Sequence, residues 1–319
     1  MFYTEVNISP YTNLLKLSDK VITAGSCFSD HIGKKLQAHK FTVLNNPFGV
    51  IFNPVALNLL LRTSLTQEKL PEEHLIQQGE LWNHFNLHSD FSALSPQGVK
   101  ENLKQQVALT RAALQGADWL ILTFGTAIVY EWKQSGQIVA NCHKVPAQAF
   151  HRRLLSVEEI VESCKELISV LPSKTRVLLT VSPVRHLKET LPQNAVSKSL
   201  LRVACHLLAE QFPQVEYFPS YEILLDELRD YRFFKEDMLH PNEVAIEHIW
   251  KRFSESCMDV PTQAFLKRWQ KVQRSLQHRS RFPASKSHQQ FLQKLLQTLH
   301  SVHEVDVSEE INLVKEQIA

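Results

Sequence analysis

Two short segments of the chain carry side chains that suit acyl chemistry. The first, Gly25-Ser26-Cys27-Phe28, follows the apolar run Lys20 to Ala24 and precedes a helical pattern. A nucleophile at such a junction meets exposed backbone N–H groups and the positive end of the helix dipole, which stabilise a thiolate or an oxyanion. The bland alternative is that Cys27 is a small buried apolar side chain.

The second segment is Asp237-Met238-Leu239-His240-Pro241. At this spacing the Asp237 carboxylate can accept the Nδ1–H of His240, which leaves Nε2 free to act as a base. Pro241 would stiffen the loop and open the next helix. A structural alternative has Asp237 capping a turn, with His240 simply lying at the surface.

Two further polar segments are candidates for ligand binding or for a structural role. Arg185 and His186 follow an apolar strand pattern and suit the binding of a carboxylate or phosphate, although Arg185 would also serve to tie down carbonyl groups. The insert around His84 and His88 lacks the ligand spacing of a metal site, so no metal and no cofactor are expected.

The elements that must position these residues alternate between strand and helix up to Phe253. Strands are predicted at Lys20–Ala24, Phe41–Leu44, Trp119–Phe124, Arg176–Val181 and Val215–Phe218. Helices are predicted at Ser29–Gln37 with Ser29 or Asp30 near the cap, Pro54–Thr63, Ser95–Ala113, from Ser156, and Ala195–Gln211. This alternation predicts an α/β fold of three layers, α/β/α, around a mostly parallel sheet. Ligands bind beyond the carboxyl ends of such strands, where the segments above lie.

Other stretches interrupt or follow this alternation. Ile128–Trp132 and Ile138–Asn141 predict a hairpin. After Asp259 the chain becomes polar and helical over Thr262–Arg279 and Ser285–His300, which predicts an α/β domain over residues 1–258 and a helical appendage over residues 259–319.

Bulk properties limit the classes of function. The 319 residues suffice for a sizeable core, and the formal net charge of +2 argues against a general nucleic-acid binder. No basic segment followed by an apolar run opens the chain and no run approaches ~20 apolar residues, so neither a signal peptide nor a membrane span is expected. The 5 cysteines lack paired spacing. Free thiols and a cytoplasmic location are therefore expected.

The chemical segments together resemble a known hydrolase layout. A nucleophile after the first strand and Asp-x-x-His near the end of an α/β domain is similar to SGNH (GDSL-like) hydrolases. More closely, the chain resembles the GSCFA domain family through Ile22-Thr23-Ala24-Gly25-Ser26-Cys27-Phe28, Asn46-Pro47-Phe48-Gly49 with Asn53-Pro54, Ser182-Pro183-Val184-Arg185-His186 and Asp237 to Pro241. The resemblance implies an SGNH-hydrolase-like, flavodoxin-like sheet. It also implies an esterase or acyltransferase that acts on an ester-linked acyl group of a small hydroxylated or carbohydrate substrate.

The resemblance also implies roles for individual residues. The nucleophile position, two residues after the Gly, falls on Cys27, while a shift of one residue would place it on Ser26. The oxyanion donors would be the N–H groups of Cys27 and Gly49.

The side-chain donor of the family pattern is missing, because Ala127 stands where an Asn is expected. Thr126, Asn141 and His143 are the candidates to replace it, although the segment of Asn141 and His143 would equally suit a plain polar loop. A ligand-binding protein with weakened catalysis is the alternative function, and the oligomeric state stays open.

Overall fold

The computed structural model describes residues 4–318, apart from the side chain of Glu189. Met1 to Tyr3, on which the expectation of no signal peptide partly rests, lie outside this range. None of the helices within it has the length and apolar character needed to cross a bilayer.

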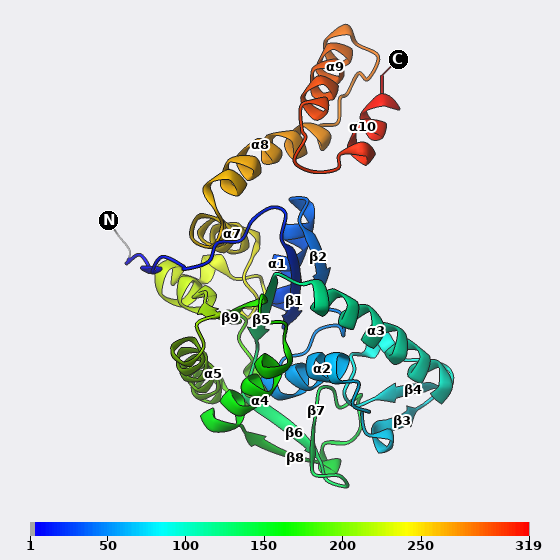
Figure 1. Ribbon diagram of the computed structural model, residues 1–319, viewed down its shortest axis with the longest axis vertical. Helices are drawn as coiled ribbons and strands as arrows, with labels where there is room; N and C mark the ends of the chain where they lie inside the picture. The colour runs from blue at the N-terminus through cyan, green and yellow to red at the C-terminus, as the bar shows by residue number, and fades with distance from the viewer. Residues whose placement is uncertain (1–3, 319) are drawn as a thin grey trace.

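A parallel sheet stands at the centre of the molecule (Figure 1). Within residues 4–318 its strands are β1 (Lys20–Gly25), β2 (Thr42–Asn45), β5 (Trp119–Phe124), β9 (Arg176–Val181) and β10 (Val215–Tyr217), in the order β10-β9-β5-β1-β2. The central strand β5 is buried along its whole length. This is the flavodoxin-like order, in which the chain reverses its direction of winding between β1 and β5. The predicted α/β class and parallel sheet are confirmed.

Helices cover both faces of the sheet and complete the three predicted layers. One face packs against α2 (Pro54–Thr66), α3 (Pro96–Gly116), α4 (Val157–Val170) and α5 (Leu191–Gln211). The other packs against α1 (Cys27–Ala38), α7 (Glu243–Cys257) and the segment of α6 (Ser220–Glu222) with the π-helix Ile223–Leu228. The N-caps Asn53, Ser95 and Ser156 each accept a backbone N–H, and Ser156 forms a full capping box with Glu159.

Small antiparallel sheets extend the domain beyond the central sheet. The predicted hairpin forms from β6 (Ile128–Trp132) and β7 (Gln137–Val139), and β8 (Phe150–Leu154) adds a strand on the other side of β6. A second hairpin, β3 (Leu75–Gln78) and β4 (Leu81–His84), lies beside α3. Neither β8 nor this second hairpin was predicted, because their strands are short and largely polar.

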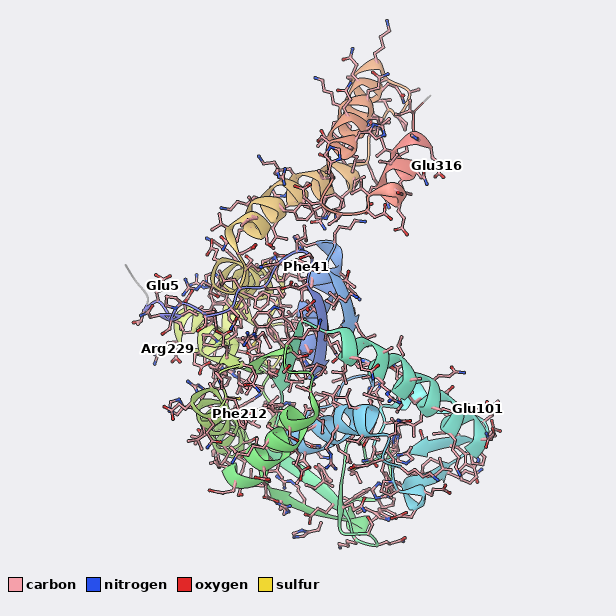
Figure 2. The ribbon with its side chains drawn as sticks, viewed as in Figure 1. Glu5, Phe41, Glu101, Phe212, Arg229 and Glu316 are labelled. Carbon is pink, nitrogen blue, oxygen red and sulfur yellow. The ribbon has the colours of Figure 1, made fainter. Side chains whose placement is uncertain are left out.

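The C-terminal helices project from the α/β unit in Figure 1. They are α8 (Val260–Leu276), α9 (Lys286–His300) and α10 (Ser308–Lys315), of which α10 was not predicted. Trp269 Nε1 donates to the carbonyl of Ala38 at 2.9 Å, and Lys40 pairs with Glu310 at 2.6 Å. Figure 2 places Phe41 on the side of the α/β unit that faces these helices. Their apolar side chains belong to the same buried cluster as those of α1.

Candidate active site

The turn between β1 and α1 is built around a glycine that no other residue can replace. Gly25 has φ +138°, and a Cβ there would lie 2.1 Å from the carbonyl oxygen of Thr123. Its N–H donates to Asn46 Oδ1 at 2.9 Å, which ties the turn to the loop after β2. Ser26 follows as the N-cap of α1, and its Oγ accepts the N–H of Phe28 at 3.3 Å. The side chain of Ser26 is therefore committed to the helix start, and the residue is 1% exposed.

Cys27 is the first residue of α1 and is partly exposed. The prediction that Ser29 or Asp30 lies near the cap is wrong, because Ser26 already satisfies the helix start. Among residues 4–318 no other residue accepts the Cys27 N–H, as is usual in a first helical turn. Burial raises the pKa of the Cys27 thiol, and the nearby Asp30 carboxylate raises it further. The backbone N–H of Cys27 acts in the opposite direction and lowers this pKa, but burial outweighs it. The resting side chain is thus a thiol that needs a base.

Asp237 and His240 form the predicted pair. His240 Nδ1 and Asp237 Oδ2 are 2.7 Å apart, while Asp237 Oδ1 accepts the N–H groups of Leu239 at 2.8 Å and of His240 at 3.0 Å. These backbone donors and the imidazole lower the pKa of Asp237 to about 2. The carboxylate is therefore ionised near neutral pH and fixes the ring with Nδ1 as donor and Nε2 free.

Helices α1 and α7 run side by side in a register that relates Cys27 to this pair. Lys35 on α1 forms an ion pair with Glu247 on α7. One turn earlier, burial lowers the pKa of His31, whose charged neighbours from outside α1 are Lys235 and Glu243. Cys27 lies one turn before His31 at the start of α1, and His240 lies in the turn that precedes α7. Both residues lie at the carboxyl end of the sheet, because Cys27 follows β1 directly and the segment of His240 is hydrogen-bonded to Arg185 after β9.

The comparison with known proteins now decides the family. The model of the GSCFA family matches residues 20–253, and that of the C-terminal domain of GSCFA domain proteins matches residues 269–319. The chain belongs to the GSCFA family. No curated protein matches the chain, and no solved structure matches it.

The backbone donors expected from the family resemblance are only partly available in this GSCFA protein. The Gly49 N–H donates to the carbonyl of Asn46 at 2.8 Å, so it closes a turn instead of facing a ligand. Gly49 itself is required there, since it has φ +74° and a Cβ would lie 2.5 Å from the Cβ of His88. The expectation that Gly49 donates to an oxyanion is therefore not supported by this geometry, whereas the Cys27 N–H is free to do so.

Thr126 follows β5, where an oxyanion donor was expected, but its hydroxyl group forms hydrogen bonds within the protein. Thr126 Oγ1 lies 3.0 Å from Ser197 Oγ and accepts the N–H of Ile128 at 3.0 Å. The neighbouring Ala127 is buried, and its N–H donates to the same Ser197 hydroxyl at 2.7 Å. Ser197 thus ties the loop after β5 to α5, and the Thr126 hydroxyl is engaged in this contact.

Asn141 and His143 lie in the insert next to the small sheets. Asn141 Oδ1 accepts the N–H of His143 at 2.9 Å, and His143 Nε2 lies 2.9 Å from the carbonyl oxygen of His84. Burial lowers the pKa of His143. These contacts fit the structural explanation, a polar loop that packs on the insert. Within the described residues no three His, Cys, Asp or Glu side chains converge as metal ligands do, and this includes the histidines of the insert.

Arg185 joins the loop after β9 to the segment that carries Asp237 and His240. Its guanidinium carbon lies 4.2 Å from the centre of the Phe234 ring and 5.2 Å from that of Tyr231. The backbone N–H of Arg185 donates to the carbonyl of Leu239 at 3.2 Å. The guanidinium group of Arg185 donates to the carbonyl of Met238 at 3.5 Å. The alternative in which Arg185 ties down carbonyl groups is the one that these contacts favour.

Two functional candidates escaped the sequence reasoning. Lys198 on α5 is buried at the carboxyl ends of β5 and β9, and only the wider apolar setting of its helix hinted at this. Asn46 has a buried Nδ2 that has no partner in the described part of the chain, while its Oδ1 binds Gly25. The signal for Asn46 was present, because it stands in a motif after β2, yet its role was not assigned.

Proposed function

We propose that this GSCFA protein catalyses acyl chemistry, with Cys27 as nucleophile and the Asp237–His240 pair as its base. The observation that supports the proposal is the packing of α1 beside α7, in which Lys35 pairs with Glu247 and His31 lies near Glu243, since Cys27 opens the first helix and His240 precedes the second. The 2.7 Å contact between Asp237 and His240 supports it further.

The first step transfers an acyl group to sulfur. His240 Nε2 takes the proton of the Cys27 thiol, Sγ bonds to the carbonyl carbon, and the carbonyl π electrons move to oxygen. Collapse of this intermediate breaks the carbon–oxygen ester bond, and the leaving alkoxide takes the proton from His240. Water or an acceptor hydroxyl, deprotonated by His240, then releases the acyl group and restores the thiol. Asp237 holds the imidazole and stabilises its cation.

Cys27 suits this role better than Ser26. The Ser26 hydroxyl is buried and accepts the Phe28 N–H, whereas Cys27 is partly exposed at the start of α1. The thiol is also intrinsically the stronger nucleophile once its proton is removed.

The same site supports a proposal for the substrate class and for the superfamily to which the protein belongs. We propose an acyl ester of a small hydroxylated molecule or carbohydrate as substrate, and the sheet order and Asp-x-x-His arrangement support placement within the SGNH (GDSL-like) superfamily. The cysteines Cys27, Cys142, Cys164, Cys205 and Cys257 are all free, which supports a reducing, cytoplasmic setting.

A thiol-specific experiment tests the proposal. The full chain is incubated with a chromogenic short-chain acyl ester, and intact-protein mass spectrometry with peptide mapping locates any acyl adduct. We expect an adduct on Cys27 in the wild type, none in Cys27→Ala, and slow formation in His240→Ala. Adduct formation at the wild-type rate in His240→Ala would remove the proposed base.

A second candidate function is ligand binding without efficient turnover. The hydrogen bond that occupies the Gly49 N–H and the Ala127 in place of an Asn donor favour it, because loss of one oxyanion donor costs about 100-fold in rate or more. Saturable binding of acyl esters with no adduct on Cys27 would support this function over catalysis.

A further inference from the structure

A buried lysine without a carboxylate partner lies beside the candidate active site. Lys198 is 1% exposed, and among residues 4–318 no acidic side chain forms an ion pair with it. Its Nζ donates to the carbonyls of Gly125 at 2.6 Å and of Ser182 at 2.7 Å. These carbonyls stand just after β5 and β9, so the ammonium group joins the ends of two central strands at the edge where Cys27 and His240 lie.

His186 lies on the loop after β9, and its electrostatic neighbours include both Lys198 and His240. Its backbone N–H donates to Asn194 Oδ1 at 2.9 Å, and its ring packs edge-on against Phe52 with 5.3 Å between ring centres. The Nε2 atom is buried, and within the described residues it has no hydrogen-bond partner. Buried polar atoms are usually hydrogen-bonded, so an unpartnered one needs an explanation, such as a partner atom on a water or a ligand.

Burial and two basic neighbours keep the ring of His186 neutral. Burial, then Lys198, then His240 lower the pKa of His186 to about 4. Burial likewise lowers the pKa of Lys198 to about 7. Below a pH of about 7, Lys198 is positively charged. His186 therefore stays neutral at mildly acidic pH, where a free histidine would take up a proton, and it is also neutral at higher pH.

We propose that His186 presents an uncharged Nε2–H to the carbonyl oxygen of the substrate and so replaces the oxyanion donor that Ala127 cannot supply, with Lys198 as the positioning residue that excludes its cationic form. The inference rests on the proposed acyl chemistry. A neutral imidazole suits this role because it donates a hydrogen bond to the developing negative charge without passing a full proton to it.

The state of the other candidate donors supports this assignment. The N–H of Gly49 bonds to Asn46, the N–H of Ala127 bonds to Ser197, and Thr126 contacts the same hydroxyl. His186 Nε2, Asn46 Nδ2 and the Cys27 N–H remain available within the described residues, and a backbone donor paired with a side-chain donor is a common form of oxyanion hole.

The test separates oxyanion formation from thiol reactivity. His186→Leu and the control His206→Leu, an exposed histidine at the other end of α5, are compared with wild type in two reactions of Cys27. Acylation by an activated short-chain ester passes through an oxyanion, while alkylation by iodoacetamide does not. We expect His186→Leu to slow acylation by about 100-fold. We expect alkylation to change by less than about threefold, and the control to match wild type in both reactions.

The outcomes distinguish the inference from the function on which it rests. Wild-type protein that alkylates but never acylates at Cys27 overturns the proposed function and the inference with it. Wild-type acylation that stays equally fast in His186→Leu overturns the inference alone and would move the donor role to the Asn46 amide. Equal slowing of both reactions also overturns it, since His186 would then act on the thiol or on the fold.

The role of Lys198 has a readout that needs no substrate. Nuclear magnetic resonance titration of the histidine rings follows the protonation of His186 in wild type and in Lys198→Met, which keeps an apolar chain of similar length. We expect the midpoint for His186 to rise in Lys198→Met because a neighbouring positive charge is lost. An unchanged midpoint in a folded variant would overturn the positioning role.

Discussion

The Nδ1 atom of His240 lies 2.7 Å from Oδ2 of Asp237, and the second oxygen of the same carboxylate accepts two successive backbone N–H groups. The carboxylate therefore holds both the imidazole ring and the loop that carries it. Removing its charge while keeping its shape separates these effects.

Asp237→Asn should slow acylation of Cys27 by about 100-fold or more, because the amide no longer fixes the ring tautomer or stabilises the imidazolium. Single-turnover acylation followed by mass spectrometry gives the rate. Asp230→Asn is the matched control: that carboxylate accepts the N–H of Arg232 two residues on, near the site but not in contact with His240. If both variants slowed alike, the effect would belong to the loop and not to the pair.

The Cys27 thiol should alkylate slowly at neutral pH. Burial and Asp30 raise its pKa above the ordinary value, so the thiolate fraction, and with it the rate with iodoacetamide, should keep increasing at a pH where a free cysteine is already fully ionised. A stopped-flow or mass-spectrometric pH series measures this. A midpoint below that of a free cysteine would show that the helix N-terminus outweighs burial.

Ser26→Ala should weaken the fold more than the chemistry. The variant loses the N-cap of α1 and should reduce the free energy of unfolding by about 1 kcal/mol. Acylation of Cys27 should remain within a few-fold of wild type. Urea denaturation measures the free energy of unfolding, and the acylation assay measures the reaction of Cys27. Loss of the acyl adduct in a variant of unchanged stability would assign the nucleophile to Ser26.

Lys198 should give stability a characteristic dependence on pH. Its pKa is about 7 in the folded state and about 10.4 when unfolded. Between these values the unfolded chain binds more protons, so raising the pH favours the folded state. The free energy of unfolding of wild type relative to Lys198→Met should therefore increase by ~2 kcal/mol between pH 7 and pH 9. A flat difference across this range would mean that Lys198 keeps an ordinary pKa.

The contact between α8 and α1 should make the C-terminal helices essential for stability. Trp269→Ala removes a 2% exposed side chain and its bond to the Ala38 carbonyl, which should cost about 3–5 kcal/mol. Val260→Ala, at a residue that is 76% exposed on the same helix, is the control. Thermal denaturation compares them, and similar melting temperatures would show that α8 packs only loosely.

The sequence predicted the features that depend on local patterns. Apolar runs such as Trp119–Phe124 located the central strands, and the capping box at Ser156 marked a helix start, because both signals lie within a few residues. The motifs located Cys27, Asp237 and His240, and the two family models confirm the family. The pairing of Asp237 with His240 was predictable because they stand three positions apart, within reach across one turn.

The sequence could not reveal what depends on distant partners. Gly49 was expected to donate to a ligand, but its N–H is held by Asn46, and the Thr126 hydroxyl meets Ser197 across 71 positions of the chain. Lys198 looks like an ordinary helical lysine until β5 and β9 bring their terminal carbonyls around it. Tertiary contacts decide such roles, and no local pattern encodes them.

The buried cluster that joins α1 to α8 and α9 also has a consequence for synthesis on the ribosome. The end of α1 is made early, but its partners Trp269 and Glu310 emerge only with the last part of the chain. Elongation through residues 260–318 takes roughly 3–12 s at ordinary rates of about 5–20 residues per second. For that interval the apolar surface beside α1 lacks the cover that α8 and α9 give it in the folded protein.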